Sequence, residues 1–416
     1  RDPVESLVEW RVEVHRHDAL KIVGIKHVVG HEYERYHAIA ERPTLPARGG
    51  RMSGETNRQW ILKARPEGMV DASLFELRET PVAALERDQV LAKTMYLSFD
   101  PTQRMWMAMD TYMPMVPIGQ PMRAGGIAQV IESKHPKYKP GDIINGLCGW
   151  QEYVVFEPNQ SDSVPPTKLP GHLDPAMTLA LSVTGLTAYF GLLEIGKPKP
   201  GETVLVSGAA GATGSVVGQI AKLKGCRVIG IAGGPDKCAW LTNKAKFDAA
   251  IDYKHDNVEE RIGALCPDGV NIYFDNVGGE ILDAALLHLA MHARVVLCGA
   301  ISQYNLADDA DRYGIKNHME LVIQRGTAEG FVILDYIDRA IEGLLSLNKW
   351  VDEGKIVQEI DMQEGFDKIP ATLERLFTGA NLGKQLLKVG DAPLPVRTSA
   401  VEKLVMRLMG AYYARR

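Results

Sequence analysis

Between about Met52 and Leu169 the chain alternates short apolar runs with turn residues. Examples of these runs are Gln89–Leu97, Gly126–Glu132 and Tyr153–Phe156, and Pro140-Gly141-Asp142 supplies a turn. Short apolar runs that are bounded by turn residues are typical of strands in a β domain. The pattern therefore predicts a small, mostly β domain over residues 52–175.

From about Thr178 the pattern changes to apolar strands that alternate with helical segments. We expect strands at Thr203–Ser207, Arg227–Ile231, Ala249–Ile251, Ile272–Asp275, Arg294–Cys298 and Gly330–Leu334. This alternation predicts a parallel sheet with right-handed crossovers. The fold class is thus α/β, with a doubly wound Rossmann sheet over residues 176–333 beside the β domain. A helix near Ile337–Glu353 and shorter elements follow.

The two ends of the chain differ from this plan. Residues 1–51 show no clean period and are interpreted as a disordered or upstream-derived extension. Their five histidines match no metal-ligand spacing: His15, His17, His27, His31 and His37. Residues 391–416 include a capping box, Ser399-x-x-Glu402, followed by an apolar stripe at helical spacing. We interpret this stripe as a surface that docks on the same chain or on a second subunit. Contact with a membrane surface is the alternative.

Length, charge and cysteine usage narrow the class of protein. A chain of 416 residues favours two packed domains, and a net charge of -5 argues against a nucleic-acid partner. No apolar run approaches the roughly 20 residues that span a bilayer. The cysteines are scattered and form no C-x-x-C pair, which favours a reducing cytoplasm over a disulfide framework or a sulfur-rich zinc site. They are Cys148, Cys226, Cys238, Cys266 and Cys298.

A glycine-rich turn is the strongest local motif. An apolar strand ends at Ser207, Gly208-x-x-Gly211-x-x-Gly214 follows, and a helical pattern runs over Ser215–Lys224. Glycine permits the tight turn and the close approach of the backbone to a pyrophosphate, which the helix N-terminus then attracts. The motif therefore predicts a dinucleotide site.

The end of the second strand indicates which dinucleotide. An NAD site places a carboxylate there, about 20 residues after the glycines, to bind the ribose. Here Ala232-Gly233-Gly234 occupies the strand tip, and Lys237 follows as a point charge for a 2′-phosphate. We interpret the nearby Asp236 as a helix cap. The sequence therefore favours NADP.

Several separated segments resemble one known group of proteins. They are Tyr96–Pro101, Met122–Gly126, Ala209–Gly214, Asp275–Gly279, Cys298–Asn305 and Gly379–Lys384. The sequence resembles the zinc-free branch of the medium-chain dehydrogenase/reductase superfamily, with its prostaglandin reductases, leukotriene B4 12-hydroxydehydrogenases and curcumin reductases. The resemblance covers residues 59–389. It implies a GroES-like substrate domain over 52–175, a return segment over 334–390 that completes it, and a homodimer.

The resemblance also implies roles for individual residues. The pyrophosphate would lie on Gly211, Ala212, Thr213 and Gly214, and the 2′-phosphate on Lys237 and Tyr253. The ribose and nicotinamide would contact Asn276, Cys298, Gly299, Ala300, Ile301, Ser302, Tyr304, Phe331, Val332, Ile333 and Asn381. Two departures stand out. Thr102-Gln103-Arg104 replaces a common Tyr-Met-Arg, and residues 305–325 lack the usual proline-rich loop.

The implied reaction delivers hydride from NADPH to the double bond of an α,β-unsaturated aldehyde or ketone. Negative charge then develops on the carbonyl oxygen, which requires a hydrogen-bond donor. Without a metal, the sequence offers tyrosine hydroxyls: Tyr304 first, beside the implied ribose, and Tyr112 second. Two alternatives remain. They are a quinone reductase of the same fold and a protein that binds NADPH without turnover.

Overall fold

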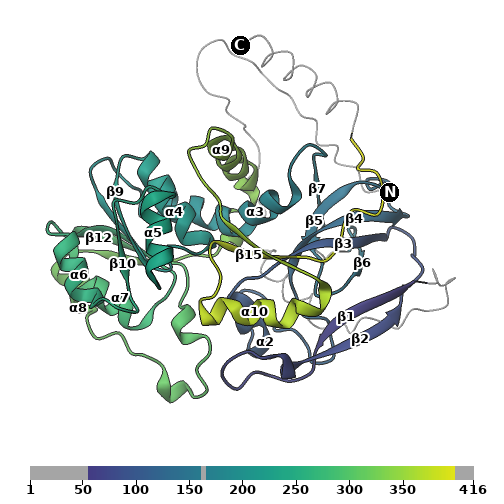
Figure 1. Ribbon diagram of the computed structural model, residues 1–416, viewed down its shortest axis with the longest axis horizontal. Helices are drawn as coiled ribbons and strands as arrows, with labels where there is room; N and C mark the ends of the chain where they lie inside the picture. Colours follow the sequence, from purple (N-terminus) through teal and green to yellow (C-terminus); the bar gives the residue numbers. More distant parts are fainter. Residues whose placement is uncertain (1–54, 161–164, 399–416) are drawn as a thin grey trace, which may run out of the picture.

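The computed structural model describes residues 55–160 and 165–398. The histidine-rich extension over 1–51 and the amphipathic stripe after Ser399 lie outside these residues. The described chain forms two lobes that lie side by side, one built on a parallel sheet and one on a mixed sheet (Figure 1). This arrangement agrees with the predicted fold class.

The first lobe contains a six-stranded parallel sheet. Its strands are β8 (Thr203–Val206), β9 (Arg227–Ala232), β10 (Ala249–Asp252), β11 (Val270–Asp275), β12 (Leu289–Leu297) and β13 (Thr327–Gly330). The spatial order is β10-β9-β8-β11-β12-β13, so the order of strands reverses between β8 and β11. Ligands of doubly wound sheets bind at the carboxyl ends of the strands at such a reversal.

Helices cover both faces of this sheet. One face packs against α3 (Pro175–Phe190), α4 (Ala212–Leu223), α5 (Pro235–Asn243) and α9 (Ala340–Asp352), and the other packs against α6 (Val258–Leu265), α7 (Gly279–Leu286) and α8 (Met319–Ile323). The start of α3 is set locally. The Asp174 carboxylate accepts from the Met177 amide at 2.7 Å, and Pro175 occupies the first helical position.

The second lobe is a mixed sheet in the order β14-β15-β3-β4-β5-β7, and β6 pairs with β3. A two-stranded ribbon of β1 and β2, and the short helix α2 (Thr102–Ala108), lie beside it (Figure 1). The strands are β1 (Thr56–Leu62), β2 (Phe75–Pro81), β3 (Val90–Ser98), β4 (Gly125–Ser133), β5 (Ile143–Leu147), β6 (Tyr153–Phe156) and β7 (Thr167–Leu169). Its core includes Leu97, Phe99 and Trp150.

The chain returns to this lobe after the parallel sheet. Strands β14 (Ile360–Glu364) and β15 (Lys384–Lys388) join the mixed sheet, with α10 (Ile369–Thr378) between them. β15 pairs antiparallel with β3. By contrast, α9 packs against α3, where a Cβ on Gly343 would lie 2.6 Å from Leu186 Cδ2. The domain limits drawn from the sequence stay proposals.

Most predicted strands differ from the observed ones only at their ends, but Gly330–Leu334 is wrong. The strand there is Thr327–Gly330, and Ile333–Arg339 forms a 3-10 helix. The apolar residues after Gly330 pack on the sheet and do not join it, since the Phe331 ring lies 6.4 Å from that of Phe274. Burial of a loop and burial of a strand give the same apolar pattern in sequence.

One helical stretch, Pro175–Gly196, is long and apolar enough to cross a membrane by composition. The prediction that no apolar run approaches the length of a bilayer span is therefore wrong for this stretch. Its most apolar window is 72% buried inside the protein, against the sheet and α9. In this structure it is a core helix.

Candidate functional site

The glycine turn after β8 lies at the reversal of the sheet. Gly208 has a φ of +56°, and a Cβ on Gly214 would lie 2.5 Å from the Gly208 carbonyl oxygen. Only glycine therefore lets α4 begin so close to the strand. The cap residue of α4, Gly211, supplies no side-chain hydrogen bond, so the first amides of the helix stay available to an anion. This geometry fits a pyrophosphate.

A buried carboxylate, Asp275, organises the neighbouring loop at the end of β11. Its oxygens accept from Ser207 Oγ and Tyr273 OH, both at 2.8 Å, and from the Gly278 amide. Burial, and then the charge of Asp275, hold the pKa of Tyr273 well above its usual range. The sequence analysis missed Ser207, Tyr273 and Asp275 as a network. The only signal was two polar residues at the ends of apolar strands.

Asn276 is held by the same network. Its side-chain amide donates to the Ser207 carbonyl at 2.7 Å, and its backbone amide donates to Ser207 Oγ at 2.9 Å. The side chain therefore joins the ends of β8 and β11. The structure places this predicted residue directly beside the glycine turn, where Gly208 approaches the Asn276 Cβ.

The carboxylate near the tip of β9 comes from another strand, β10, whereas an NAD site has its ribose-binding carboxylate at the end of the second strand itself. Asp252, at the end of β10, accepts from the Gly234 amide at 2.7 Å and from His255 Nδ1 at 2.8 Å. The Tyr253 ring covers Gly233, whose Cβ would lie 2.8 Å from it. The interpretation of Asp236 as a cap is wrong. Helix α5 begins at Pro235, two residues before the start that this cap implies, and Gly234 takes the cap position without a side-chain bond.

Lys237 lies on α5 close to the other lobe. Its ammonium donates to the Gly379 carbonyl at 2.8 Å, at the end of α10. Burial, and then the positive charge of Lys254, lower the pKa of Lys237. Two cations near a backbone carbonyl leave this corner positive, which suits a phosphate. Lys237 and Tyr253 therefore both lie near the β9 tip, as the sequence analysis expected.

The segment after β12 folds back over the Asp275 loop. The Cys298 and Gly299 amides donate to the Asp275 carbonyl at 2.9 and 3.0 Å, and Ile301 and Ser302 donate to Asn276 and Val277. Burial raises the pKa of Cys298 to about 12, so its thiol is not an activated nucleophile. The Tyr304 hydroxyl accepts from the Ala300 amide at 3.0 Å.

Tyr112 approaches from the other lobe, in the loop after α2. Its hydroxyl lies 2.8 Å from Thr102 Oγ1, so the departure at position 102 gives this tyrosine a partner. Burial raises the pKa of both Tyr112 and Tyr304. The pKa of Tyr112 is raised further through the charges of Asp100, Tyr304 and Cys298. The two predicted tyrosines are thus within electrostatic reach of each other.

Arg123 lies two residues before β4. Its Nη1 donates to the Pro114 carbonyl at 2.7 Å, and burial lowers its pKa to about 10. Within residues 55–160 and 165–398, no group of three or more His, Cys, Asp or Glu side chains could hold a metal ion.

The remaining predicted residues lie around this centre. Phe331 packs into the core of the parallel lobe, against Gly191 and Phe274, and Val332 and Ile333 are partly buried beside it. The Asn381 amide donates to the Gly383 carbonyl at 3.1 Å. These side chains contact protein atoms, so their roles toward a ligand stay proposals.

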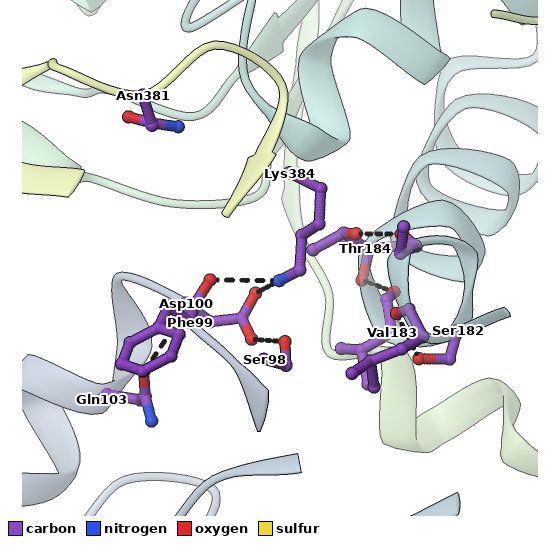
Figure 2. A network of polar contacts seen from close by, with 12 residues as sticks. Ser98, Phe99, Asp100, Gln103, Ser182, Val183, Thr184, Asn381 and Lys384 are labelled. Atoms are coloured by element: carbon purple, nitrogen blue, oxygen red, sulfur yellow. Dashed lines mark hydrogen bonds and ion pairs between the residues drawn. The ribbon is translucent and has the colours of Figure 1, made fainter. Parts of the chain in front are cut away.

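A buried ion pair was missed by the sequence analysis. Lys384, 1% exposed, donates to the Phe99 carbonyl at 3.1 Å and pairs with the Asp100 carboxylate, which also accepts from Ser98 Oγ at 2.6 Å (Figure 2). A lysine within the apolar strand β15 was the available signal.

Comparisons with known proteins agree with this geometry. A family model described as the N-terminal domain of oxidoreductase matches residues 58–164, and one described as zinc-binding dehydrogenase matches residues 212–347. The NADPH-dependent curcumin reductase of Escherichia coli is 40% identical over 346 residues, covering 81% of this chain and 98% of that protein. Prostaglandin reductase 1 of Rattus norvegicus is 40% identical over 337 residues, covering 79% and 98%.

The chain belongs to the zinc-independent medium-chain dehydrogenase/reductase family. Among solved structures of this family, CurA from Vibrio vulnificus in complex with NADPH is 36% identical, with a TM-score of 0.75. The match covers 80% of this chain and 99% of that one. In this structure the turn after β8 and the segment after β12 belong to the parallel-sheet lobe, and the Tyr112 loop belongs to the other lobe.

Proposed function

We propose that this chain is an NADPH-dependent reductase that transfers hydride to the carbon–carbon double bond of α,β-unsaturated aldehydes and ketones. The observation that carries the proposal is the meeting of two features at the sheet reversal. The glycine turn has unpaired helix amides, and phenols from both lobes, Tyr112 and Tyr304, lie within electrostatic reach of each other. Relatives named curcumin reductase and prostaglandin reductase support it.

In this proposal the cofactor lies along the ends of β8, β9 and β11. Gly211, Ala212, Thr213 and Gly214 hold the pyrophosphate, and Lys237 and Tyr253 hold the 2′-phosphate. The residues that contact the nicotinamide and its ribose are Asn276, Asn381, Phe331, Val332, Ile333 and the segment Cys298–Ser302. When bound, the nicotinamide supplies the hydride.

The tyrosines act on the substrate oxygen. Charge develops on that oxygen as the β-carbon gains hydride, and an oriented hydroxyl stabilises it. The Tyr304 oxygen accepts the Ala300 amide, so its own proton is free to be donated. Because the pKa values of Tyr304 and Tyr112 are raised, both phenols keep their protons at neutral pH.

The test is NADPH oxidation at 340 nm with a panel of 2-alkenals, enones and quinones, and with NADH and a chelator as controls. Chelator-resistant oxidation with enones is the expected result. Turnover with quinones alone would assign the quinone reductase alternative. Binding of NADPH without any oxidation would assign the non-catalytic one.

The chain is further proposed to be a homodimer. All four residues of the edge strand β13 are exposed, and in the described residues β13 pairs only with β12. Met319, Val322 and Ile323 of the adjacent α8 are 55%, 66% and 55% exposed. An unpaired edge beside exposed apolar side chains favours pairing with a second copy.

Light scattering would test this surface. The wild type is expected at about twice the 45.8 kDa chain mass, and Val322→Asp at the single mass. Val183→Asp, at a valine on α3 that is 55% exposed, is the control and should stay dimeric. A monomeric wild type, or dissociation in both variants alike, would rule out this interface.

A cytoplasmic location is part of the proposal. All five cysteines are free, and none is arranged to form a disulfide. Free, scattered cysteines are typical of a reducing compartment.

A further inference from the structure

Lys384 is a basic side chain placed inside the protein. It is 1% exposed, and its ammonium has two acceptors, the Phe99 carbonyl and the Asp100 carboxylate. Burial of a charge is costly unless it is paired and hydrogen-bonded. An apolar residue would fill this position at a lower cost in free energy. Packing alone therefore does not explain the buried ion pair.

The backbone of this segment touches the cofactor turn. The Gly383 amide donates to the Ala210 carbonyl at 2.9 Å, and Gly383 forms a parallel bridge with Gly211. A Cβ on Gly383 would lie 2.2 Å from the Glu359 carbonyl oxygen, so only glycine allows this close approach of the two backbones. Residues 383 and 384 therefore connect the cofactor turn to the Asp100 side of the mixed lobe.

Asp100 in turn fixes the start of α2. Its amide donates to Gln103 Oε1 at 3.1 Å, and Gln103 Nε2 donates to the Arg123 carbonyl at 2.8 Å. Thr102, in the first turn of α2, is the hydrogen-bond partner of the Tyr112 hydroxyl. Figure 2 shows Lys384 pointing from β15 toward Phe99 and Asp100, while Asn381 lies apart from this contact.

We propose that Lys384 is a positioning residue of the active site, which through its ion pair with Asp100 holds the Thr102–Tyr112 hydroxyl pair in register with the cofactor turn. The inference rests on the proposed function only in giving Tyr112 a substrate. The ion pair acts on Tyr112 by position and by charge, and both effects can be measured.

The charged and titratable groups that face Tyr112 are few. Asp100, Tyr304 and Cys298 raise the pKa of Tyr112, after burial, and the Thr102 hydrogen bond lowers it. Arg123 also interacts with Tyr112. Asp100 is the carboxylate among these groups. Its pairing with Lys384 therefore affects the electrostatic potential at the Tyr112 hydroxyl, and with it the pKa of Tyr112.

The experiment places 3-fluorotyrosine at position 112 and follows its titration by fluorine NMR in the cofactor-free protein. Asp100→Asn removes the negative charge and should lower the Tyr112 midpoint by roughly one pH unit. Lys384→Met leaves Asp100 uncompensated and should raise the midpoint. If a single variant fails to fold, the double variant Asp100→Asn/Lys384→Met tests the same electrostatic effect on the pKa of Tyr112. Its midpoint should fall, since the carboxylate that raises the pKa of Tyr112 is removed.

Glu202→Gln is the matched control. It breaks a similar partly buried ion pair, with Arg294, immediately before β8 and so at the opposite ends of the strands. The control should leave the Tyr112 midpoint unchanged. An unchanged midpoint in Asp100→Asn and Lys384→Met, a shift in Asp100→Asn alone, or an equal shift in the control would overturn the proposal.

Kinetics supply the second readout. Lys384→Met should lower kcat for an enone by roughly 10-fold, the loss of one oriented donor, while the NADPH Kd measured by fluorescence changes less than threefold. A lost NADPH affinity with an unchanged kcat would mean that Lys384 serves the cofactor turn alone. The titration needs no turnover, so a wild type without enone reductase activity would count against the proposed function and leave this test standing.

Discussion

The Tyr304 hydroxyl is arranged as a donor. Its oxygen accepts the Ala300 amide at 3.0 Å, which orients the remaining proton away from the backbone. Tyr304→Phe is therefore expected to lower kcat with an enone by roughly 10-fold or more, the effect of losing one preorganised donor. Steady-state kinetics and NADPH titration of the variant measure this. Wild-type turnover in Tyr304→Phe would remove Tyr304 from the mechanism.

Lys237 is the residue that should separate the two nicotinamide cofactors. Its ammonium lies within electrostatic reach of Lys254 and of Asp361, which pairs with Arg375, and it donates to the Gly379 carbonyl. Lys237→Ala should weaken NADPH binding by roughly 10-fold or more, the scale of one charge-assisted phosphate contact, and leave NADH binding unchanged. Equal losses for the two cofactors, measured by fluorescence titration, would show that Lys237 does not read the 2′-phosphate.

At the scale of elements, the contact between the β8 turn and α4 depends on one missing side chain. Gly214→Ala would force a Cβ to within 2.5 Å of a carbonyl oxygen, so α4 must shift away from the strand. We expect NADPH affinity to fall by at least about 10-fold, with a lowered Tm. Gly314→Ala, where a Cβ meets nothing within 4 Å, is the control. Similar effects in both variants would contradict this reading of the turn.

The same elements show what sequence could predict. The strand–glycine–helix order identified the cofactor turn because each of its parts is local in the chain. The Lys384–Asp100 pair was out of reach because its two residues are 284 positions apart in the chain. The Thr102–Tyr112 contact spans ten residues, and it depends on the path of the loop after α2, which has no sequence period. The error at Gly330–Leu334 has another cause, since a buried loop carries the same apolar residues as a strand.

At the scale of the molecule, buried tyrosines limit the stability of the protein in alkali. Burial raises the pKa of seven tyrosines above the usual 10: Tyr112, Tyr138, Tyr153, Tyr189, Tyr273, Tyr304 and Tyr336. Above pH 10 the unfolded chain releases these protons while the folded chain keeps them. The free energy of unfolding should therefore be constant with respect to these groups below pH 10 and fall as the pH rises above it.

Denaturant unfolding at a series of pH values checks this prediction. Tyr273→Phe removes one such group, so the loss of stability above pH 10 should be less steep by up to about 1.4 kcal/mol per pH unit. The variant also loses the hydrogen bond to Asp275, which lowers its stability equally at every pH. An unchanged slope would mean that Tyr273 ionises as readily in the folded protein as in the unfolded one.

The place of β15 in the mixed sheet has a consequence for how the chain is made. β15 lies between β14 and β3, so the mixed sheet, whose first strand begins at Val90, lacks its inner partner until residue 388 has left the ribosome. The parallel sheet, whose strands all fall within residues 203–330, can close earlier during synthesis. An engineer who cuts the chain after residue 175 would thus obtain a β fragment with an open, aggregation-prone edge. Grafting its substrate loops onto another protein requires carrying the last strand along.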